Sequence, residues 1–176
     1  RRSFIHKSGL IMAAGMMPYP SFLLPQKNKK LGIALVGLGY YSTDLLAPAL
    51  QLTKHCELKG IVTGSPEKIP VWQSKYGIKD GNVYSYETMH EIANNDEIDV
   101  VYIVLPPALH AKYSIIAANA GKHVWCEKPM EVSAEKCQAM IDACKKNKVK
   151  LAFGAGARIE TYSIFRKRFN IPLREV

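Results

Sequence analysis

A short glycine-rich segment has the residue types of a phosphate-binding turn. Gly37 and Gly39 stand in the run Gly-Leu-Gly-Tyr-Tyr-Ser, directly after an apolar stretch with the length of a buried strand. The first glycine permits a tight turn, and the second lets backbone N–H groups approach a pyrophosphate at the start of the next helix. Ser42 replaces a third glycine and is still small enough for close packing. The segment predicts a dinucleotide site made by Gly37, Leu38, Gly39, Tyr40 and Tyr41, and the alternative is an ordinary strand-to-helix turn.

The tip of the second expected strand bears on which dinucleotide binds. A site for NAD places a carboxylate at this tip, where it accepts the ribose hydroxyls. Residues 63–65 contain no acid, and Glu57 lies at the other end of the strand. Ser65 can donate a hydrogen bond to a 2′-phosphate and Lys68 can supply positive charge, although Lys68 as a solvated surface residue is the alternative. The tip predicts NADP in preference to NAD, and it argues against a methyltransferase of the same architecture.

Two other segments carry polar residues where expected strands end. Leu105 ends the most apolar strand, and His110 follows it at the start of a helix. His110 contacts either the nicotinamide ribose or a substrate, or else it has a structural role only. Glu127 and Lys128 end the next major strand and precede a proline. Lys128 can polarise a carbonyl or accept a proton as a hydride leaves an alcohol carbon, and Glu127 can orient Lys128 or a ribose hydroxyl. The alternative for this pair is a surface ion pair of negligible energy.

Strand-like and helix-like segments alternate between residues 31 and 153. The expected strands are short and apolar, as buried parallel strands are, and they cover 31–37, 57–63, 99–105, 123–126 and 149–153. The expected helices cover 42–54, a segment capped by Ser65 that Pro70 either kinks or delays, 87–94, 108–120 closed by Gly121, and 134–147 capped by Ser133. This alternation predicts an α/β fold, a doubly wound parallel sheet of the Rossmann type.

Charge is distributed unevenly along the 176 residues, whose net charge is +9. Residues 1–30 hold six Lys or Arg and no acid, and residues 154–176 hold five basic and two acidic residues. The region between them is neutral, which argues against nucleic acid as a partner. The four cysteines show no Cys-x-x-Cys pair and no zinc-like spacing with histidine, so no metal site is expected. No apolar run is long enough for stable insertion into a membrane.

Residues 1–30 have the layout of an export signal followed by a linker arm. A charged start precedes a short apolar stretch, and prolines then interrupt the segment. Arg1 and Arg2 are followed by Ser-Phe-Ile, which resembles a twin-arginine signal, although His6 displaces the usual lysine by one position. The segment predicts export to the periplasm, and the alternative is an unstructured tail on a cytoplasmic protein.

Several of these motifs together resemble the Gfo/Idh/MocA oxidoreductases over residues 31–153. The similar segments are Val36–Tyr41, Tyr102–Pro106, Leu109–Ala111 and Ala120–Met130, and the last contains the specific run Ala-Gly-Lys-His-Val followed by Glu-Lys-Pro. The resemblance implies a nicotinamide cofactor, here NADP, and a sugar or polyol substrate. It assigns the cofactor role to Gly37, Gly39, Tyr40, Ser65, Lys68 and His110, and the active-site role of the Glu-Lys-Pro run to Glu127 and Lys128.

The resemblance stops after Phe153, where the family continues with a Gly-Tyr-Arg segment and a second α/β domain. Here Gly154 begins a Gly-Ala-Gly-Ala-Arg run and a basic tail, so residues 154–176 are expected to be a truncated or divergent tail. In the family the second domain supplies substrate contacts, further catalytic groups and the dimer face. The expected function is therefore the cofactor-binding domain of an NADP-dependent oxidoreductase, with a non-catalytic NADP-binding module or an inactive gene fragment as alternatives.

Overall fold

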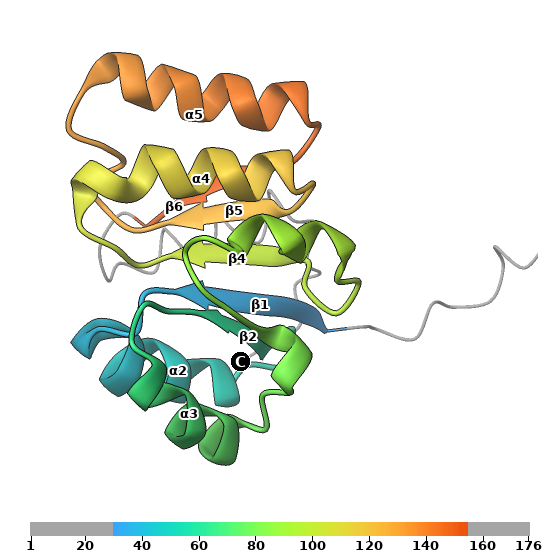
Figure 1. The fold of residues 1–176 in the computed structure, drawn as a ribbon. Helices are drawn as coiled ribbons and strands as arrows, with labels where there is room; N and C mark the ends of the chain where they lie inside the picture. The colour runs from blue at the N-terminus through green and yellow to red at the C-terminus, as the bar shows by residue number, and fades with distance from the viewer. Residues whose placement is uncertain (1–29, 155–176) are drawn as a thin grey trace, which may run out of the picture.

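Six apolar segments pair as one parallel sheet in residues 30–154, the part of the chain that the computed structural model describes (Figure 1). The strand order is β3-β2-β1-β4-β5-β6. The strands are β1 (Leu31–Val36), β2 (Cys56–Val62), β3 (Val83–Tyr84), β4 (Val100–Ile103), β5 (His123–Cys126) and β6 (Leu151–Phe153). Because β1 has β2 on one side and β4 on the other, the chain changes direction across the sheet at β1, and this change opens a crevice beyond the strand ends.

The carboxyl ends of the strands lie level with one another. Val36 pairs with Val62 on one side and with Ile103 on the other, and Ile103 pairs with Cys126. The loops that leave these strands therefore emerge at one edge of the sheet, on the left in Figure 1. The residues of the expected site follow these strand ends directly, so the register of the sheet brings them together.

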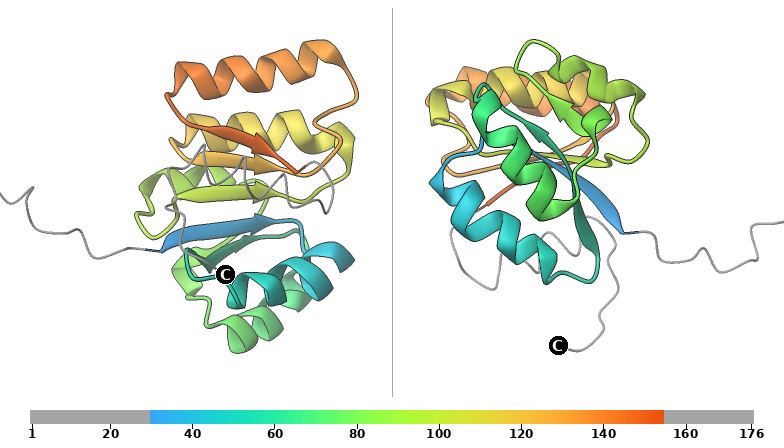
Figure 2. Two further views of the ribbon diagram at one scale, coloured as in Figure 1. Left: turned by 180° about the vertical axis from the view of Figure 1, so that it is seen from behind. Right: turned by 60° about the horizontal axis from the view of Figure 1, so that its bottom comes forward.

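Helices cover both faces of the sheet, as the alternating sequence pattern predicts. Helices α4 (His110–Asn119) and α5 (Ala134–Lys146) lie on one face, whereas α2 (Ala47–Gln51) and α3 (Ile69–Tyr76) lie on the other (Figures 1 and 2). Two apolar cores result. One joins α4 and α5 to inward residues such as Val101 and Val124, and the other joins α2 and α3 to residues such as Leu35 and Ile61. The doubly wound α/β fold is thereby confirmed.

The ends of two helices follow the local signals in the sequence. The Ser133 side chain accepts a hydrogen bond from the Lys136 backbone N–H, which makes it the N-cap of α5. Gly121 adopts a positive φ of 73° just after α4, a conformation that favours glycine. Both features depend only on residues close in sequence, and both were predicted correctly.

The segment predicted as one helix over 42–54 differs in the structure. A π-helical segment, η2 (Tyr41–Leu46), begins directly after the glycine turn and passes into α2. The buried Ser42 hydroxyl donates to the Gly37 carbonyl at 2.6 Å, which holds the wide turn against the end of β1. Wide π turns of this kind occur often at functional sites.

Three other expectations are corrected. Ser65 makes no side-chain cap; a 3₁₀ turn, η3 (Pro66–Lys68), comes first, and α3 begins at Ile69 so that Pro70 falls in its first turn, where its missing N–H costs nothing. The helix expected over 87–94 is a 3₁₀ helix, η5 (Met89–Asn94). The two-residue strand β3 was not predicted, because a pair of residues carries no periodic pattern.

Candidate functional site

The glycine turn has the geometry of a phosphate cradle. Gly37 has φ of +92°, and a Cβ added there would lie 2.4 Å from the Val104 carbonyl oxygen, so only glycine fits between β1 and β4. A Cβ added at Gly39 would meet no atom within 4 Å, which shows that this glycine faces open space. The turn is therefore closed toward the protein at Gly37 and open at Gly39, where a pyrophosphate would approach.

The tip of β2 is free of acids, as the sequence predicts. Thr63 is buried there, and its hydroxyl accepts a hydrogen bond from the Ser65 backbone N–H at 3.0 Å. Glu57 lies near the amino end of the strand and forms an ion pair with Lys59 at 2.6 Å. No carboxylate at this tip is placed to receive ribose hydroxyls.

Lys68 links the β2 tip to the glycine turn. Its ammonium donates a hydrogen bond to the Leu38 carbonyl oxygen at 2.8 Å, and the side chain is partly buried. The alternative of a fully solvated surface lysine does not hold, because the ammonium crosses from one loop to the other. The structure thus brings Ser65, Lys68 and the glycine turn to one end of the site, with a positive charge between them.

The structure corrects the cofactor-binding role expected for His110. Its side chain is 0 % exposed, so it cannot contact a cofactor in the cleft. Its Nε2 lies 2.7 Å from the Leu105 carbonyl oxygen and its Nδ1 lies 2.8 Å from that of Pro129. The imidazole therefore ties the loop after β4 to the loop after β5, which is the structural role that the sequence left open. Leu105 itself lies on the rim of the cleft.

Glu127 and Lys128 do not form an ion pair. The Tyr102 hydroxyl donates a hydrogen bond to Glu127 Oε1, and Glu127 Oε2 receives a long hydrogen bond from the Lys128 backbone N–H at 3.4 Å. The Lys128 side chain is exposed, and its ammonium has no hydrogen bond or ion pair with any residue between 30 and 154. The two residues therefore offer a fixed carboxylate and a free ammonium at the same rim.

A cleft of about 700 Å³ at the carboxyl edge of the sheet joins the glycine turn to the rims at Leu105 and Glu127, while Ser65 and Lys68 lie outside its lining. Six of its residues were predicted as cofactor contacts, and the others come from β4, β5, η2 and the residues that follow β4 and β6. The lining consists of Gly39, Tyr40, Tyr41, Leu46, Tyr102, Val104, Leu105, Trp125, Glu127, Lys128 and Gly154. Tyr40 is 74 % exposed, which leaves its ring available to a ligand. The volume lies within the range of small-molecule and cofactor sites.

Tyr102 and Trp125 are the site residues that the sequence analysis missed. Both belong to apolar strands and were counted only as parts of those strands. The parallel register pairs Tyr102 with Trp125, and strand alternation places Glu127 on the same face as Trp125. The strand register could have identified them. When β4 and β5 are aligned, the Tyr102 hydroxyl and the Glu127 carboxylate lie near each other on one face of the sheet.

The environment of the cleft changes the acidity of its groups. Burial, together with the hydrogen bond to Glu127, raises the pKa of Tyr102 far above its ordinary value. Partial burial and the nearby Glu127 carboxylate also raise the pKa of Tyr41. On the opposite face of β5, burial raises the pKa of the Cys126 thiol to about 12. The two tyrosines are therefore neutral hydrogen-bond donors at neutral pH.

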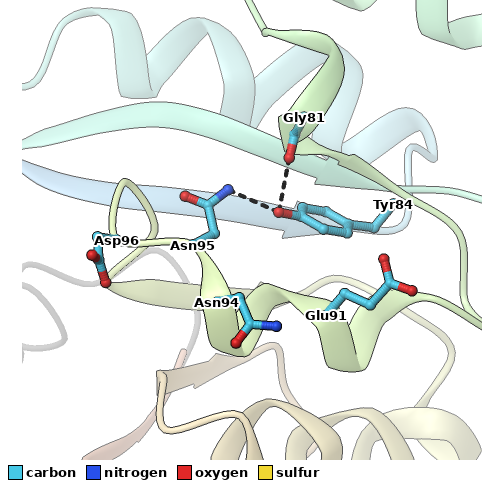
Figure 3. A pocket seen from close by; sticks show the side chains of 6 residues that line it. All are labelled: Gly81, Tyr84, Glu91, Asn94, Asn95 and Asp96. Carbon is cyan, nitrogen blue, oxygen red and sulfur yellow. Dashed lines mark hydrogen bonds between the residues drawn. The ribbon is translucent and has the colours of Figure 1, made fainter.

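A second hollow lies away from the carboxyl edge, beside η5 and the loop that leads to β4 (Figure 3). Its polar groups largely satisfy one another: the Tyr84 hydroxyl donates to the Gly81 carbonyl and accepts from the Asn95 amide. The hollow lacks the glycine turn and the strand ends on which phosphate binding depends. We assign it no ligand.

No helix in residues 30–154 is both long and apolar enough to cross a membrane. The parallel sheet, the glycine turn after β1 and the cleft at the strand ends together define a dinucleotide-binding domain of the Rossmann class. The chain belongs to the Gfo/Idh/MocA family: residues 31–155 match the family model described as an oxidoreductase family with an NAD-binding Rossmann fold.

Similar proteins include several sugar and polyol oxidoreductases. D-xylose 1-dehydrogenase (NADP(+)) of Haloarcula marismortui is 33 % identical over 114 residues, which are 65 % of this chain and 31 % of that protein. Inositol 2-dehydrogenase of Salmonella typhimurium is 30 % identical over 117 residues, 66 % of this chain and 34 % of that protein. The chain spans about a third of the length of these curated relatives.

Solved structures show the same fold. The aldose-aldose oxidoreductase of Caulobacter crescentus, crystallised with glycerol, matches with a TM-score of 0.71 and 45 % identity. The match covers 72 % of this chain and 38 % of that one. The WlbA dehydrogenase of Bordetella pertussis, in complex with NADH and UDP-GlcNAcA, matches with a TM-score of 0.62 and 28 % identity over 72 % of this chain and 38 % of that one.

Proposed function

We propose that this chain binds NADP and serves an oxidoreductase that transfers a hydride to or from a sugar or polyol. The observation that carries the cofactor choice is the Lys68 ammonium, which lies between an acid-free β2 tip and the glycine turn. A cation and a serine hydroxyl suit a 2′-phosphate, whereas the ribose of NAD calls for a carboxylate there. The NADP(+) named for the xylose dehydrogenase supports the same choice.

The residues of the cleft fit such a cofactor. The open side of Gly39 and the first turn after it would hold the pyrophosphate, and Ser65 with Lys68 would hold the 2′-phosphate. Tyr40, Tyr41 and Leu105 would cover the middle of the cofactor, and Glu127 would accept a hydrogen bond from a ribose hydroxyl. A bound nicotinamide supplies a carbon that accepts or donates the hydride.

Lys128 is the residue we assign to proton transfer. Its ammonium stands free at the rim of the cleft, where it can donate a hydrogen bond to the oxygen of a carbonyl substrate. In the oxidation direction the same amine, when neutral, takes the proton of the alcohol as the hydride leaves. Glu127 lies at the same rim, where its carboxylate is held by the Tyr102 hydroxyl.

Within the family, we propose that this chain resembles glucose–fructose oxidoreductase. The arginine pair near residue 1 is similar to the twin-arginine signal of that periplasmic, tightly NADP-binding enzyme, and an aldose substrate agrees with the activity named for the Caulobacter relative. The arginine pair lies outside the described residues. Periplasmic location and oligomerisation through the family's second domain belong to the same proposal.

Calorimetric titration of the chain with NADP and with NAD tests the cofactor assignment. Charge-assisted hydrogen bonds to the 2′-phosphate should favour NADP by about tenfold or more. Equal affinities, or tighter binding of NAD, would refute the assignment. Absorbance of NADPH in the presence of glucose, fructose, xylose and inosose then tests the substrate class, and oxidation by a simple ketone but by none of these compounds would count against a sugar or polyol.

A further inference from the structure

One buried hydroxyl in the cleft points at a charged residue of the proposed site. Tyr102 is 3 % exposed on β4, and its hydroxyl donates to Glu127 Oε1. The carboxylate belongs to the residue just after β5, 25 residues away in the sequence. A hydroxyl buried among apolar strands loses its hydration, so its one hydrogen bond is strongly retained.

The ring of Tyr102 is held in place by a stacking contact. It stacks on the Trp125 ring with centroids 4.4 Å apart and planes 5° from parallel. Trp125 occupies the register position beside Tyr102, and Glu127 follows two residues later on the same face of β5. The three side chains therefore form a row in which the aromatic pair leaves the hydroxyl little freedom except toward the carboxylate.

The two oxygens of the Glu127 carboxylate have different hydrogen-bond partners. Oε1 is occupied by Tyr102, while Oε2 receives only the 3.4 Å contact from the Lys128 backbone within the described residues. Both oxygens lie near Gly154, where an added Cβ would be 3.5 Å from Oε1 and 3.6 Å from Oε2. Because Glu127 lines the cleft, Oε2 keeps capacity to accept a hydrogen bond from a further donor.

The raised pKa of Tyr102 agrees with its hydroxyl acting as a hydrogen-bond donor to Glu127. Burial and the Glu127 carboxylate raise the pKa of Tyr102, so the hydroxyl keeps its proton across the physiological range. The charged groups facing it are Glu127 and, less directly, Tyr41 and Cys126 in their ionised forms. All three favour the protonated phenol.

From this geometry we infer that Tyr102 is a positioning residue for the nicotinamide end of the site: it fixes the Glu127 carboxylate so that Oε2 faces the ribose of a bound NADP(H). The inference rests on the proposed function. It assigns Tyr102 no contact with the cofactor, because its effect passes through Glu127.

The test measures two ligands against single and double variants of the full chain. NADPH reports on both ends of the site, and adenosine 2′,5′-bisphosphate reports on the adenosine end alone. Tyr102→Phe keeps the stacked ring and removes the donor, so it should weaken NADPH by about three- to tenfold and leave the bisphosphate within twofold. Glu127→Gln, which changes the acceptor instead, should give the same selective loss.

Tyr84→Phe is the matched control. The Tyr84 hydroxyl is also buried and hydrogen-bonded, to Gly81 and Asn95, but it lies at the hollow away from the cleft (Figure 3). Its loss should lower the melting temperature to a similar extent without changing NADPH affinity. This comparison separates a local effect on Glu127 from general loosening of the domain.

The double variant Tyr102→Phe/Glu127→Gln decides whether Tyr102 acts through Glu127. Its NADPH affinity should equal that of Glu127→Gln alone, because a positioning residue has nothing left to position. Additive losses, equal weakening of both ligands, or unchanged NADPH binding by Tyr102→Phe would each overturn the inference while leaving the proposed function intact. A wild-type chain that binds neither NADPH nor the bisphosphate would overturn both.

Discussion

Alanine should have different effects at the two glycines of the turn after β1: a loss of stability at Gly37 and a loss of cofactor affinity at Gly39. In Gly37→Ala the new methyl group would lie 2.4 Å from the Val104 carbonyl oxygen and 2.7 Å from Leu105 Cδ2. The backbone there also has φ of +92°, which L residues rarely adopt. In Gly39→Ala the methyl group meets no protein atom within 4 Å.

The expected loss of stability for Gly37→Ala follows from these two sources. A non-glycine residue in an unfavourable backbone region costs about 1–3 kcal/mol. Forcing a methyl group into a packed position costs about another 1–3 kcal/mol, since the backbone carbonyl of Val104, just after β4, must move. Together they give a decrease of about 2–6 kcal/mol in the free energy of unfolding. Gly39→Ala should change that free energy by less than about 1 kcal/mol, because neither source applies.

Gly39→Ala should instead weaken ligand binding. Its methyl group would fill the open space in which the pyrophosphate approaches the backbone, so NADPH affinity should fall by at least about tenfold, or about 1.4 kcal/mol. Urea unfolding followed by circular dichroism gives the stability of each variant, and calorimetry gives the affinity. A Gly37→Ala variant as stable as the wild type, or a Gly39→Ala variant that binds NADPH normally, would refute the reading of this turn.

Three further predictions concern charge, alkaline stability and export. Lys68→Met should lower the affinity for NADP by about tenfold and that for NAD much less, and calorimetry with Lys75→Met as an exposed-lysine control checks this. Because burial raises the pKa of Cys126 to about 12, its thiol contributes stability that is complete below the ordinary thiol pKa and is lost as the pH rises toward 12. Cys126→Ala should therefore flatten the fall of melting temperature above pH 9, and an unchanged slope would contradict the assignment. Residues 1–30 fused to a folded reporter should direct it to the periplasm, and Arg1→Lys/Arg2→Lys should retain it in the cytoplasm; retention of the unaltered fusion would count against a twin-arginine signal.

Local signals in the sequence were sufficient for much of the fold. The glycine turn, the Ser133 cap and Gly121 at the end of α4 each depend on neighbouring residues, and all were placed correctly. The apolar runs identified five of the six strands for the same reason. The π-helical start of η2 was not predictable, since it depends on how Ser42 holds the end of β1 rather than on helical periodicity.

The sequence by itself determined that this chain folds around a parallel sheet with a glycine turn after β1 and no acid at the tip of β2, because each of these properties depends on a short run of residues. Only the tertiary structure decided what the polar side chains do. It buried His110 between two loops, directed Lys68 to the glycine turn, and joined Tyr102 to Glu127 instead of pairing Glu127 with Lys128. The physical reason is that hydrogen-bond partners depend on strand register and loop packing, which bring together groups that are distant in the chain.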